Sequence, residues 1–212
     1  MYGDELRSRD YYEGRARWYD WGNRISALLR GASDTRERVK AIDHLNLKPG
    51  HHVLEVSVGT GANLPLMARH LGPAGRPIGL DISRAMLDMC RRKVRRHALA
   101  FDLIEGEAAH LPFAGQVFDA VFHHGGIAEF GDKKRAIEEM MRVARPGAKI
   151  VICDPGVPPD RRLPLVSRLL LRLNPPGYAQ EPPLDSIPPQ ARNVHLTWFR
   201  GDAWYLIDFV NP

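Results

Sequence analysis

The sequence predicts an α/β protein built on a doubly wound sheet of seven strands, which is mostly parallel and has an antiparallel last strand. Two observations support this fold class. Between residues 51 and 154, short apolar runs rich in valine and isoleucine alternate with helical segments, as strands and crossover helices do in a parallel sheet. Two further apolar runs surround Gly201-Asp202, and this pattern indicates a terminal hairpin.

The chain is long enough to form one domain with its own buried core. It has 212 residues, of which 44% are hydrophobic and 26% are charged, so neither disulfides nor a metal are needed to stabilise it. We expect a single domain over residues 1–212. Its parts are N-terminal helices at 1–48, an α/β core at 49–153, a proline-rich insertion at 154–192 and the terminal hairpin at 193–212.

The composition excludes several classes of protein. No apolar run approaches the roughly 20 residues of a membrane span, and the charged start of the chain lacks a secretory pattern, so we expect a cytoplasmic protein. Cys90 and Cys153 lack the spacing of zinc ligands or of a disulfide framework, which predicts buried thiols and no metal site. The net charge of +5 permits an acidic partner without requiring one.

The predicted elements follow one another in a regular order. Ser33 or Asp34 caps a first helix that ends before Pro49, and Ser83 caps a later one. The predicted strands occupy residues 51–58, 78–83, 101–106, 117–124 and 148–154, followed by 194–200 and 203–210 in the hairpin. The other helices of the core are expected at 62–71, 83–98 and 133–144, and the proline-rich insertion holds one short helix candidate at 163–173.

A glycine-rich turn follows the first strand of the core. In Ser57-Val58-Gly59-Thr60-Gly61 the chain passes from a strand to a helix, and such a turn lets a ligand approach the backbone and the helix N–H groups. Asp81 ends the next strand 20 residues after Gly61, where a carboxylate can bind both hydroxyls of a ribose. The pair predicts a nucleoside ligand, with a purely structural turn as the alternative.

A dinucleotide-dependent oxidoreductase uses the same turn and the same acid. Its third glycine, which allows close packing of helix on strand, would fall at position 64, where this chain has Leu64. The antiparallel hairpin at the end of the chain is also unusual for that class. Both observations favour a different nucleoside cofactor.

Five segments resemble the consecutive motifs of the class I S-adenosylmethionine-dependent methyltransferases. In order they are VLEVSVGTGANL, IGLDIS, EGEAAHLPF, FDAVFHHGG and VARPGAKIVI. The resemblance covers about residues 40–153 and is strongest to the branch of ubiquinone and menaquinone biosynthesis enzymes, whose N-terminal helix is similar around Tyr19 and Asn23. It implies a Rossmann-like methyltransferase fold, S-adenosylmethionine as cofactor, and a small-molecule or lipid-like acceptor.

The same resemblance implies roles for individual residues. Those expected at the cofactor are Glu55, Ser57, Gly59, Thr60, Gly61, Asp81, Ile82, Met86, Glu107, Ala108 and His123. Asp81 would hold the ribose and Glu107 the adenine amino group, although aspartate is more usual than glutamate at the latter position. Ser57 stands where the family has glycine, so we expect an ordinary backbone angle there.

The candidate catalytic residues are His123, His124 and Tyr19. The two histidines end the fourth strand beside the expected ligand crevice, and His124 is predicted to act as a general base or as a contact to the acceptor; capping of the strand is the structural alternative. Tyr19 belongs to an aromatic cluster that could cover the cofactor or simply pack on the core.

Two basic segments have both a functional and a structural interpretation. Residues 91–97 end a helix, where cations suit the helix dipole, and contact with nucleic acid is the less favoured interpretation. Residues 161–173 are predicted to pack against the sheet, with peripheral contact to an anionic membrane as the alternative. The sequence indicates no oligomeric state.

The sequence therefore predicts methyl transfer from S-adenosylmethionine to a quinone-like, phospholipid-headgroup or specialised-metabolite acceptor. Three alternatives are a nucleic-acid methyltransferase, a nicotinamide-dependent oxidoreductase and a non-catalytic module that binds the cofactor.

Overall fold

A computed structural model describes residues 34–95, 101–158, 180–199 and 203–212 of the chain. Within these ranges the strands form one sheet in the order β3-β2-β1-β4-β5-β7-β6. The strands are β1 (His52–Val56), β2 (Arg76–Asp81), β3 (Asp102–Glu105), β4 (Phe118–His124), β5 (Ala144–Pro155), β6 (Arg192–Phe199) and β7 (Trp204–Val210).

The sheet is parallel except at β7. The pairs β1–β2, β1–β4, β2–β3 and β4–β5 are parallel, whereas β7 runs antiparallel between β5 and β6. The predicted fold class is thus confirmed, including the terminal hairpin and the antiparallel last strand. The hairpin is inserted with its second strand against β5, because β7 is the more apolar of the two and is buried along its length.

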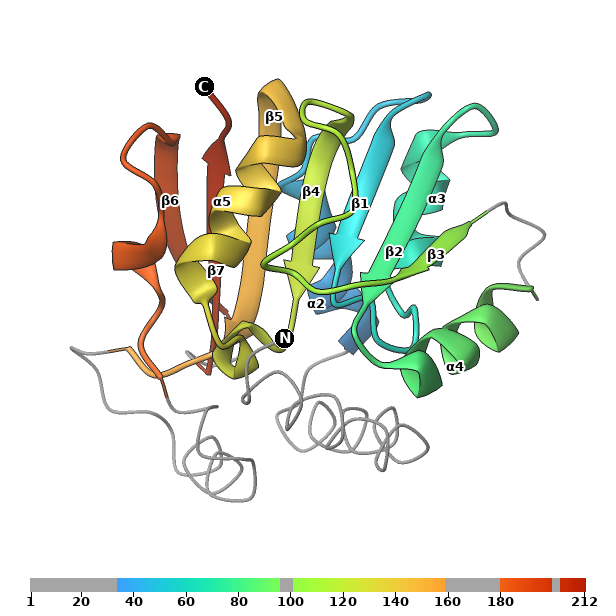
Figure 1. Cartoon of the computed structure of the whole chain (residues 1–212), viewed down its shortest axis with the longest axis horizontal. Helices are drawn as coiled ribbons and strands as arrows, with labels where there is room; N and C mark the ends of the chain where they lie inside the picture. Colours follow the sequence, from blue (N-terminus) through green and yellow to red (C-terminus); the bar gives the residue numbers. More distant parts are fainter. Residues whose placement is uncertain (1–33, 96–100, 159–179, 200–202) are drawn as a thin grey trace.

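Helices cover both faces of the sheet (Figure 1). One face carries α5 (Lys133–Val143), and the other carries α2 (Asp34–Asp43), α3 (Leu64–Leu71) and α4 (Arg84–Val94). Each face has its own apolar core, because alternate residues of a strand point to opposite sides. On β4, Val121 packs toward α5, and its neighbour Phe122 packs in the core of the other face.

The helix signals in the sequence correspond to observed structure. The Ser83 side chain accepts a hydrogen bond from the Met86 N–H and caps α4, as predicted. Asp132 caps α5 in the same way by accepting from the Arg135 N–H. Cys90 and Cys153 are both buried free thiols, also as predicted.

The beginning of β5 differs from its prediction. The strand starts at Ala144, before the expected residue 148, and its register against β4 shifts between Phe118 and Ala120. Gly147 has a φ of 79° within this irregular stretch, a conformation that favours glycine. The stretch Arg145-Pro146-Gly147 therefore forms a bulge inside the strand.

Several predictions fall on other parts of the chain, among them most of the N-terminal helices at 1–48 and of the insertion at 154–192. Tyr19 with its aromatic neighbours, and the segment 161–173, lie outside the described residues. In the described part of the chain, no helix is long and apolar enough to cross a membrane.

Candidate functional site

A cleft opens at the carboxyl ends of the strands where the strand order reverses. β1 pairs with β2 on one side and with β4 on the other, so the segments that follow these strands diverge and leave space between them. The cleft and the open solvent space at its mouth together amount to about 730 Å³. Its lining residues are Ser57, Gly59, Leu80, Asp81, Ile82, Met86, Gly106–Ala109, Gly125, Gly126, Glu129–Asp132 and Ala136.

The turn after β1 has the backbone conformation of a ligand-binding loop. Gly59 and Gly61 have φ values of 55° and 75°, and Ser57 has a φ of 59°. The expectation of an ordinary angle at Ser57 is therefore wrong: serine occupies the left-handed region, at a cost of roughly 1–2 kcal/mol. The turn keeps this shape because the Val58 N–H donates to the Leu80 carbonyl on β2, and Gly61 donates to Val58.

Asp81 connects this turn to β2. One of its carboxylate oxygens accepts from the Gly59 N–H at 2.8 Å, and the other accepts from the Ser83 N–H at 2.9 Å. These backbone bonds do not use all four lone pairs of the carboxylate, which leaves acceptor capacity for a ligand hydroxyl. Burial raises the pKa of Asp81 to about 6, while the backbone N–H groups oppose that rise.

Glu55 lies fully buried on β1 and is not among the residues that line the cleft. Its Oε1 accepts from the Asn63 amide at 2.6 Å, and Asn63 in turn accepts from Arg38 of α2 at 3.0 Å. The second oxygen, Oε2, has no hydrogen-bond partner among the described residues. Because burial outweighs the Asn63 hydrogen bond and the charge of Arg38, the pKa of Glu55 rises to about 8. Glu55 is therefore mostly neutral near pH 7 in the ligand-free protein, and a cationic group brought close to Oε2 would favour its ionised form.

A second wall follows β3 and is formed by Gly106–Ala109. The Gly106 N–H donates to the Asp81 carbonyl at 3.0 Å, which fixes this wall to the first one. The Glu107 carboxylate is mostly buried and lies 3.4 Å from the His110 imidazole. Glu107 therefore offers an acceptor at the edge of the cleft.

The third wall follows β4 and is held from β5. Asp154 is buried, and its two oxygens accept from the Gly126 and Ala128 N–H groups at 3.0 and 3.1 Å. These bonds fix the short helix η2 (Ile127–Glu129), which leads into the cleft residues Glu129–Asp132. Burial raises the pKa of Asp154 to about 7.

His123 lies behind this third wall. Its Nδ1 is 3.0 Å from the Val56 carbonyl oxygen, which can only accept, so Nδ1 carries the proton. The ring stands 5.2 Å from that of Phe130, a residue of the cleft wall. Burial lowers the pKa of His123 to about 4, so this imidazole is neutral at neutral pH.

His124 points to the opposite face of the sheet. Its Nδ1 is 3.4 Å from the Arg38 guanidinium, which has only donors, so Nδ1 accepts and the proton resides on Nε2. The ring also packs at 4.9 Å from that of Trp204 on β7. In this tautomer Nε2 is a hydrogen-bond donor, which favours contact with an acceptor oxygen over the role of a base.

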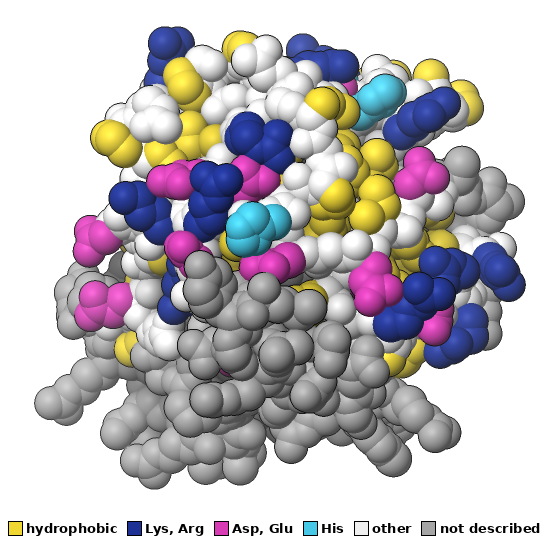
Figure 2. Space-filling view, in the orientation of Figure 1, with side chains coloured by type: hydrophobic (Ala, Val, Ile, Leu, Met, Phe, Trp, Pro, Cys, Tyr) yellow, Lys and Arg dark blue, Asp and Glu magenta, His cyan; other side chains and the backbone are white. Residues whose placement is uncertain are grey.

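The charged side chains that line the cleft in the described part of the chain are all acidic. Four carboxylates line it, from Asp81, Glu107, Glu129 and Asp132, and no Lys or Arg is among the described residues that line it. Figure 2 shows basic side chains gathered elsewhere, over α4, where Arg84, Arg91 and Arg92 lie. An acidic cleft attracts a sulfonium or ammonium cation and repels a pyrophosphate. The residues present therefore fit S-adenosylmethionine better than a dinucleotide.

The structure brings most of the predicted cofactor residues to one cleft. Those that line it are Ser57, Gly59, Asp81, Ile82, Met86, Glu107 and Ala108. Glu55, Thr60, Gly61, His123 and His124 are not among the lining residues and lie behind the walls or on the other face of the sheet. Sequence reasoning missed Arg38, Asn63 and Asp154. For Asp154 the sequence did offer a signal, because this acid lies near the end of β5 just as Asp81 lies at the end of β2. Arg38 and Asn63 had no such signal.

Comparisons with known proteins agree with this geometry. A family model described as a methyltransferase domain matches residues 53–147. A demethylmenaquinone methyltransferase of Thermus thermophilus is 34% identical over 151 residues, which cover 71% of this chain and 67% of that relative. The enzyme of the same name from Lactobacillus johnsonii is 32% identical over 151 residues, or 70% of this chain and 61% of the relative.

The fold is shared with solved structures at lower identity. A SAM-dependent methyltransferase from Aquifex aeolicus superimposes with a TM-score of 0.66 at 19% identity, over 94% of this chain and 98% of that one. This similarity shows the fold alone, whereas the identity to the Thermus thermophilus relative shows the family. The chain belongs to the class I S-adenosylmethionine-dependent methyltransferases, near their menaquinone-biosynthesis branch.

Proposed function

We propose that this protein transfers a methyl group from S-adenosylmethionine to a quinone-like small molecule. The observation that carries the proposal is the acidic cleft at the carboxyl ends of β1 and β2, with no Lys or Arg among its described lining residues. When bound, S-adenosylmethionine supplies an electrophilic methyl group on a cationic sulfur. A positively charged ligand is stabilised by such walls, whereas the phosphates of NAD or of a nucleic acid are not.

We propose that each wall of the cleft binds a different part of the cofactor. Asp81 is placed to accept the ribose hydroxyls, since its carboxylate already faces the cleft from the end of β2. Glu107 is placed to accept from the adenine amino group. From the family resemblance we also propose that Glu55 belongs to the methionine end of the cofactor site, behind the residues that line the cleft.

The chain's contribution to methyl transfer is to orient the acceptor and exclude water. We propose that the Nε2–H of His124 donates a hydrogen bond to an oxygen of the methyl acceptor, with Arg38 holding the ring in that tautomer. When a quinol-type acceptor has lost a hydroxyl proton to solvent, its ring is nucleophilic, and a nearby N–H donor stabilises the resulting oxyanion. Tyr19 and the insertion at 154–192 remain our candidates for covering the acceptor.

The acceptor class is inferred from the curated relatives. Their name states that they act on demethylmenaquinone, and both align with this chain over about 70% of its length. The chain's match covers 67% and 61% of those two relatives, so the acceptor is a proposal for this chain.

The test is direct. Purified protein is incubated with isotope-labelled S-adenosylmethionine and a short-chain demethylmenaquinol, and the product is identified by mass. We expect one added methyl group, and a loss of turnover in His124→Ala at saturating substrate. If the protein bound NAD but did not bind S-adenosylhomocysteine, the proposal would be excluded. Cofactor binding without transfer to this acceptor, or to any in a cell extract, would instead indicate a non-catalytic module. Transfer to nucleic acid, with affinity falling steeply with salt, would indicate a nucleic-acid methyltransferase.

A further inference from the structure

Residues 106–113 form a segment without regular secondary structure, and the wall Gly106–Ala109 is its first half. Its first four residues line the cleft, and the segment then crosses toward α5 before β4 begins. A strand in this position would be fixed by ladder hydrogen bonds, but this segment has only turn contacts of its own, such as His110 N–H to the Glu107 carbonyl at 3.2 Å. Its position must therefore be set by neighbouring elements.

The beginning of the wall is held by β2. The Gly106 N–H bonds to the Asp81 carbonyl, and a side chain at residue 106 would meet Leu80 at 3.0 Å. The other end of the segment lies against α5.

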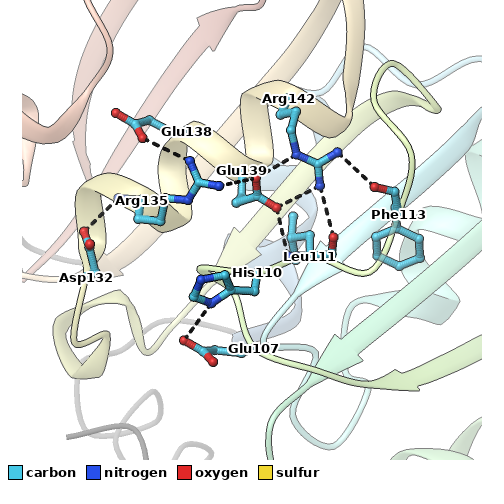
Figure 3. Close-up of polar contacts among 9 residues, drawn as sticks. All are labelled: Glu107, His110, Leu111, Phe113, Asp132, Arg135, Glu138, Glu139 and Arg142. Atoms are coloured by element: carbon cyan, nitrogen blue, oxygen red, sulfur yellow. Dashed lines mark hydrogen bonds and ion pairs between the residues drawn. The ribbon is translucent and has the colours of Figure 1, made fainter. Parts of the chain in front are cut away.

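Glu139 and Arg142 of α5 hold that other end (Figure 3). Glu139 accepts from the Leu111 N–H at 2.9 Å. Arg142 donates to the carbonyls of Leu111 and Phe113 at 3.0 and 2.9 Å. Three backbone groups of the segment are thus satisfied by two side chains one helical turn apart.

The two side chains also hold each other in place. Arg142 donates to both Glu139 oxygens, at 2.7 and 2.8 Å, in a bidentate pair. The Glu139 side chain is 4% exposed, and Arg142 lowers its pKa, so the pair is ionised at neutral pH. Leu111 is buried in the core below, and the Phe113 ring packs edge-on against Phe118 at 5.0 Å.

The same helix lines the cleft at its other end. Ala136 of α5 and its cap Asp132 both belong to the cleft lining, whereas Glu139 and Arg142 lie one and two turns further along. A single rigid element therefore forms part of one wall and fixes the position of another.

We propose that Glu139 and Arg142 are positioning residues for the cofactor, which set its affinity by fixing the wall Gly106–Ala109 at the adenine end of the cleft. The inference rests on the proposed function. The pair touches no cofactor, so it acts on binding and leaves methyl transfer at saturating cofactor unchanged.

A purely structural pair would alter stability alone, and the variants are chosen to separate the two roles. Arg142→Lys keeps the charge but lacks the planar fork that reaches two carbonyls and Glu139 together. The double variant Glu139→Leu with Arg142→Met replaces the ion pair by apolar side chains, which often preserves stability. Glu138→Gln is the matched control: Glu138 lies on the same helix and forms an ion pair with Arg135 at 3.7 Å, and Arg135 keeps its own hydrogen bond to Glu139 at 3.2 Å when that charge is removed.

The experiment measures the Kd of S-adenosylhomocysteine and of methylthioadenosine by calorimetry, at a temperature where every variant is folded. We expect both Kd values to rise on the order of tenfold in Arg142→Lys and in the double variant, which is the effect of about one misplaced hydrogen bond. The control should keep the wild-type Kd, and kcat at saturating cofactor should stay unchanged in all variants.

Other results would overturn the inference. Wild-type Kd values in the folded variants would show that the pair is only structural. A weaker Kd for S-adenosylhomocysteine with an unchanged Kd for methylthioadenosine would place the effect away from the adenine end. A fall in kcat with unchanged Kd would show a catalytic effect. If the wild-type protein bound neither ligand, the proposed function itself would fail, and the inference with it.

Discussion

Close packing at single residues shapes the turn that carries the cofactor site. Gly61 has a φ of 75°, and a Cβ added there would overlap the Cys90 sulfur on α4. Glycine is therefore required at this position both for its backbone conformation and for its size.

We predict that Gly61→Ala destabilises the protein by about 2–3 kcal/mol and that Cys90→Ala restores part of this loss. In the double variant the clash with sulfur is gone, but the strain from φ remains. Urea denaturation of the two single variants and the double variant measures the coupling between the sites. If the destabilisations caused by the two single substitutions simply added up in the double variant, the Cβ introduced at position 61 would not clash with the Cys90 sulfur. Gly59→Ala is the control, because a Cβ there meets no atom within 4 Å and only strain is expected.

Residues joined by local sequence patterns could be predicted, and residues joined only by tertiary packing could not. Asp81 and Gly59 follow from a strand, a turn and the next strand. The contact of Arg38 with Asn63 depends on how α2 packs over the sheet, 25 residues away along the chain. The prediction of an ordinary backbone angle at Ser57 was wrong, because hydrogen bonds of the neighbouring residues hold serine in a conformation that its side chain disfavours.

At the scale of elements, the irregular start of β5 is held by the residue that follows β7. The Asn211 amide donates to the carbonyls of Ala144 and Arg145, at 2.8 and 3.3 Å, and its backbone pairs with Gly147 and Ala148. This bulge lies at the end of β5 away from the cleft. The sequence predicted a strand only from residue 148 and did not indicate this partner, because Asn211 is 67 residues away from Ala144.

We predict that Asn211→Asp destabilises the protein by about 1–3 kcal/mol near neutral pH, since a carboxylate would face two carbonyl oxygens. Acidification should reduce the loss, because a protonated carboxyl can donate again. Asn211→Ala should show a loss that does not depend on pH. Thermal unfolding at two pH values distinguishes the variants. A changed affinity for S-adenosylhomocysteine would contradict the separation of this end of the sheet from the cleft.

For the whole molecule, buried carboxyl groups should make stability depend on pH. Burial raises the pKa of Glu55 to about 8 and of Asp154 to about 7. Between their ordinary values near 4 and these values, the folded protein binds more protons than the unfolded chain. The two carboxyl shifts therefore lower the free energy of unfolding as pH rises through this window, and together they exceed the opposite contribution of His123, whose pKa falls from 6.5 to about 4 on folding.

We predict a decrease of about 2 kcal/mol or more between pH 5 and pH 8 in the ligand-free protein. In Glu55→Gln, where the side chain cannot ionise, the slope should be clearly smaller. Chemical denaturation at several pH values provides the measurement. A flat or rising profile for the wild-type protein would show that these carboxyl groups are ionised without penalty.

The cleft is assembled from stretches of chain that are far apart in sequence: the turn after β1, the end of β2, the segment after β3, the loop after β4 and the start of α5. A ligand that needs all of them can bind only to the fully assembled sheet. At a hundred times its Kd, such a ligand adds about 2.7 kcal/mol to the stability of the fold. In a living cell the supply of methyl donor would then govern the lifetime of the protein as well as its rate of turnover, because chains that lack it unfold more often and reach proteases sooner.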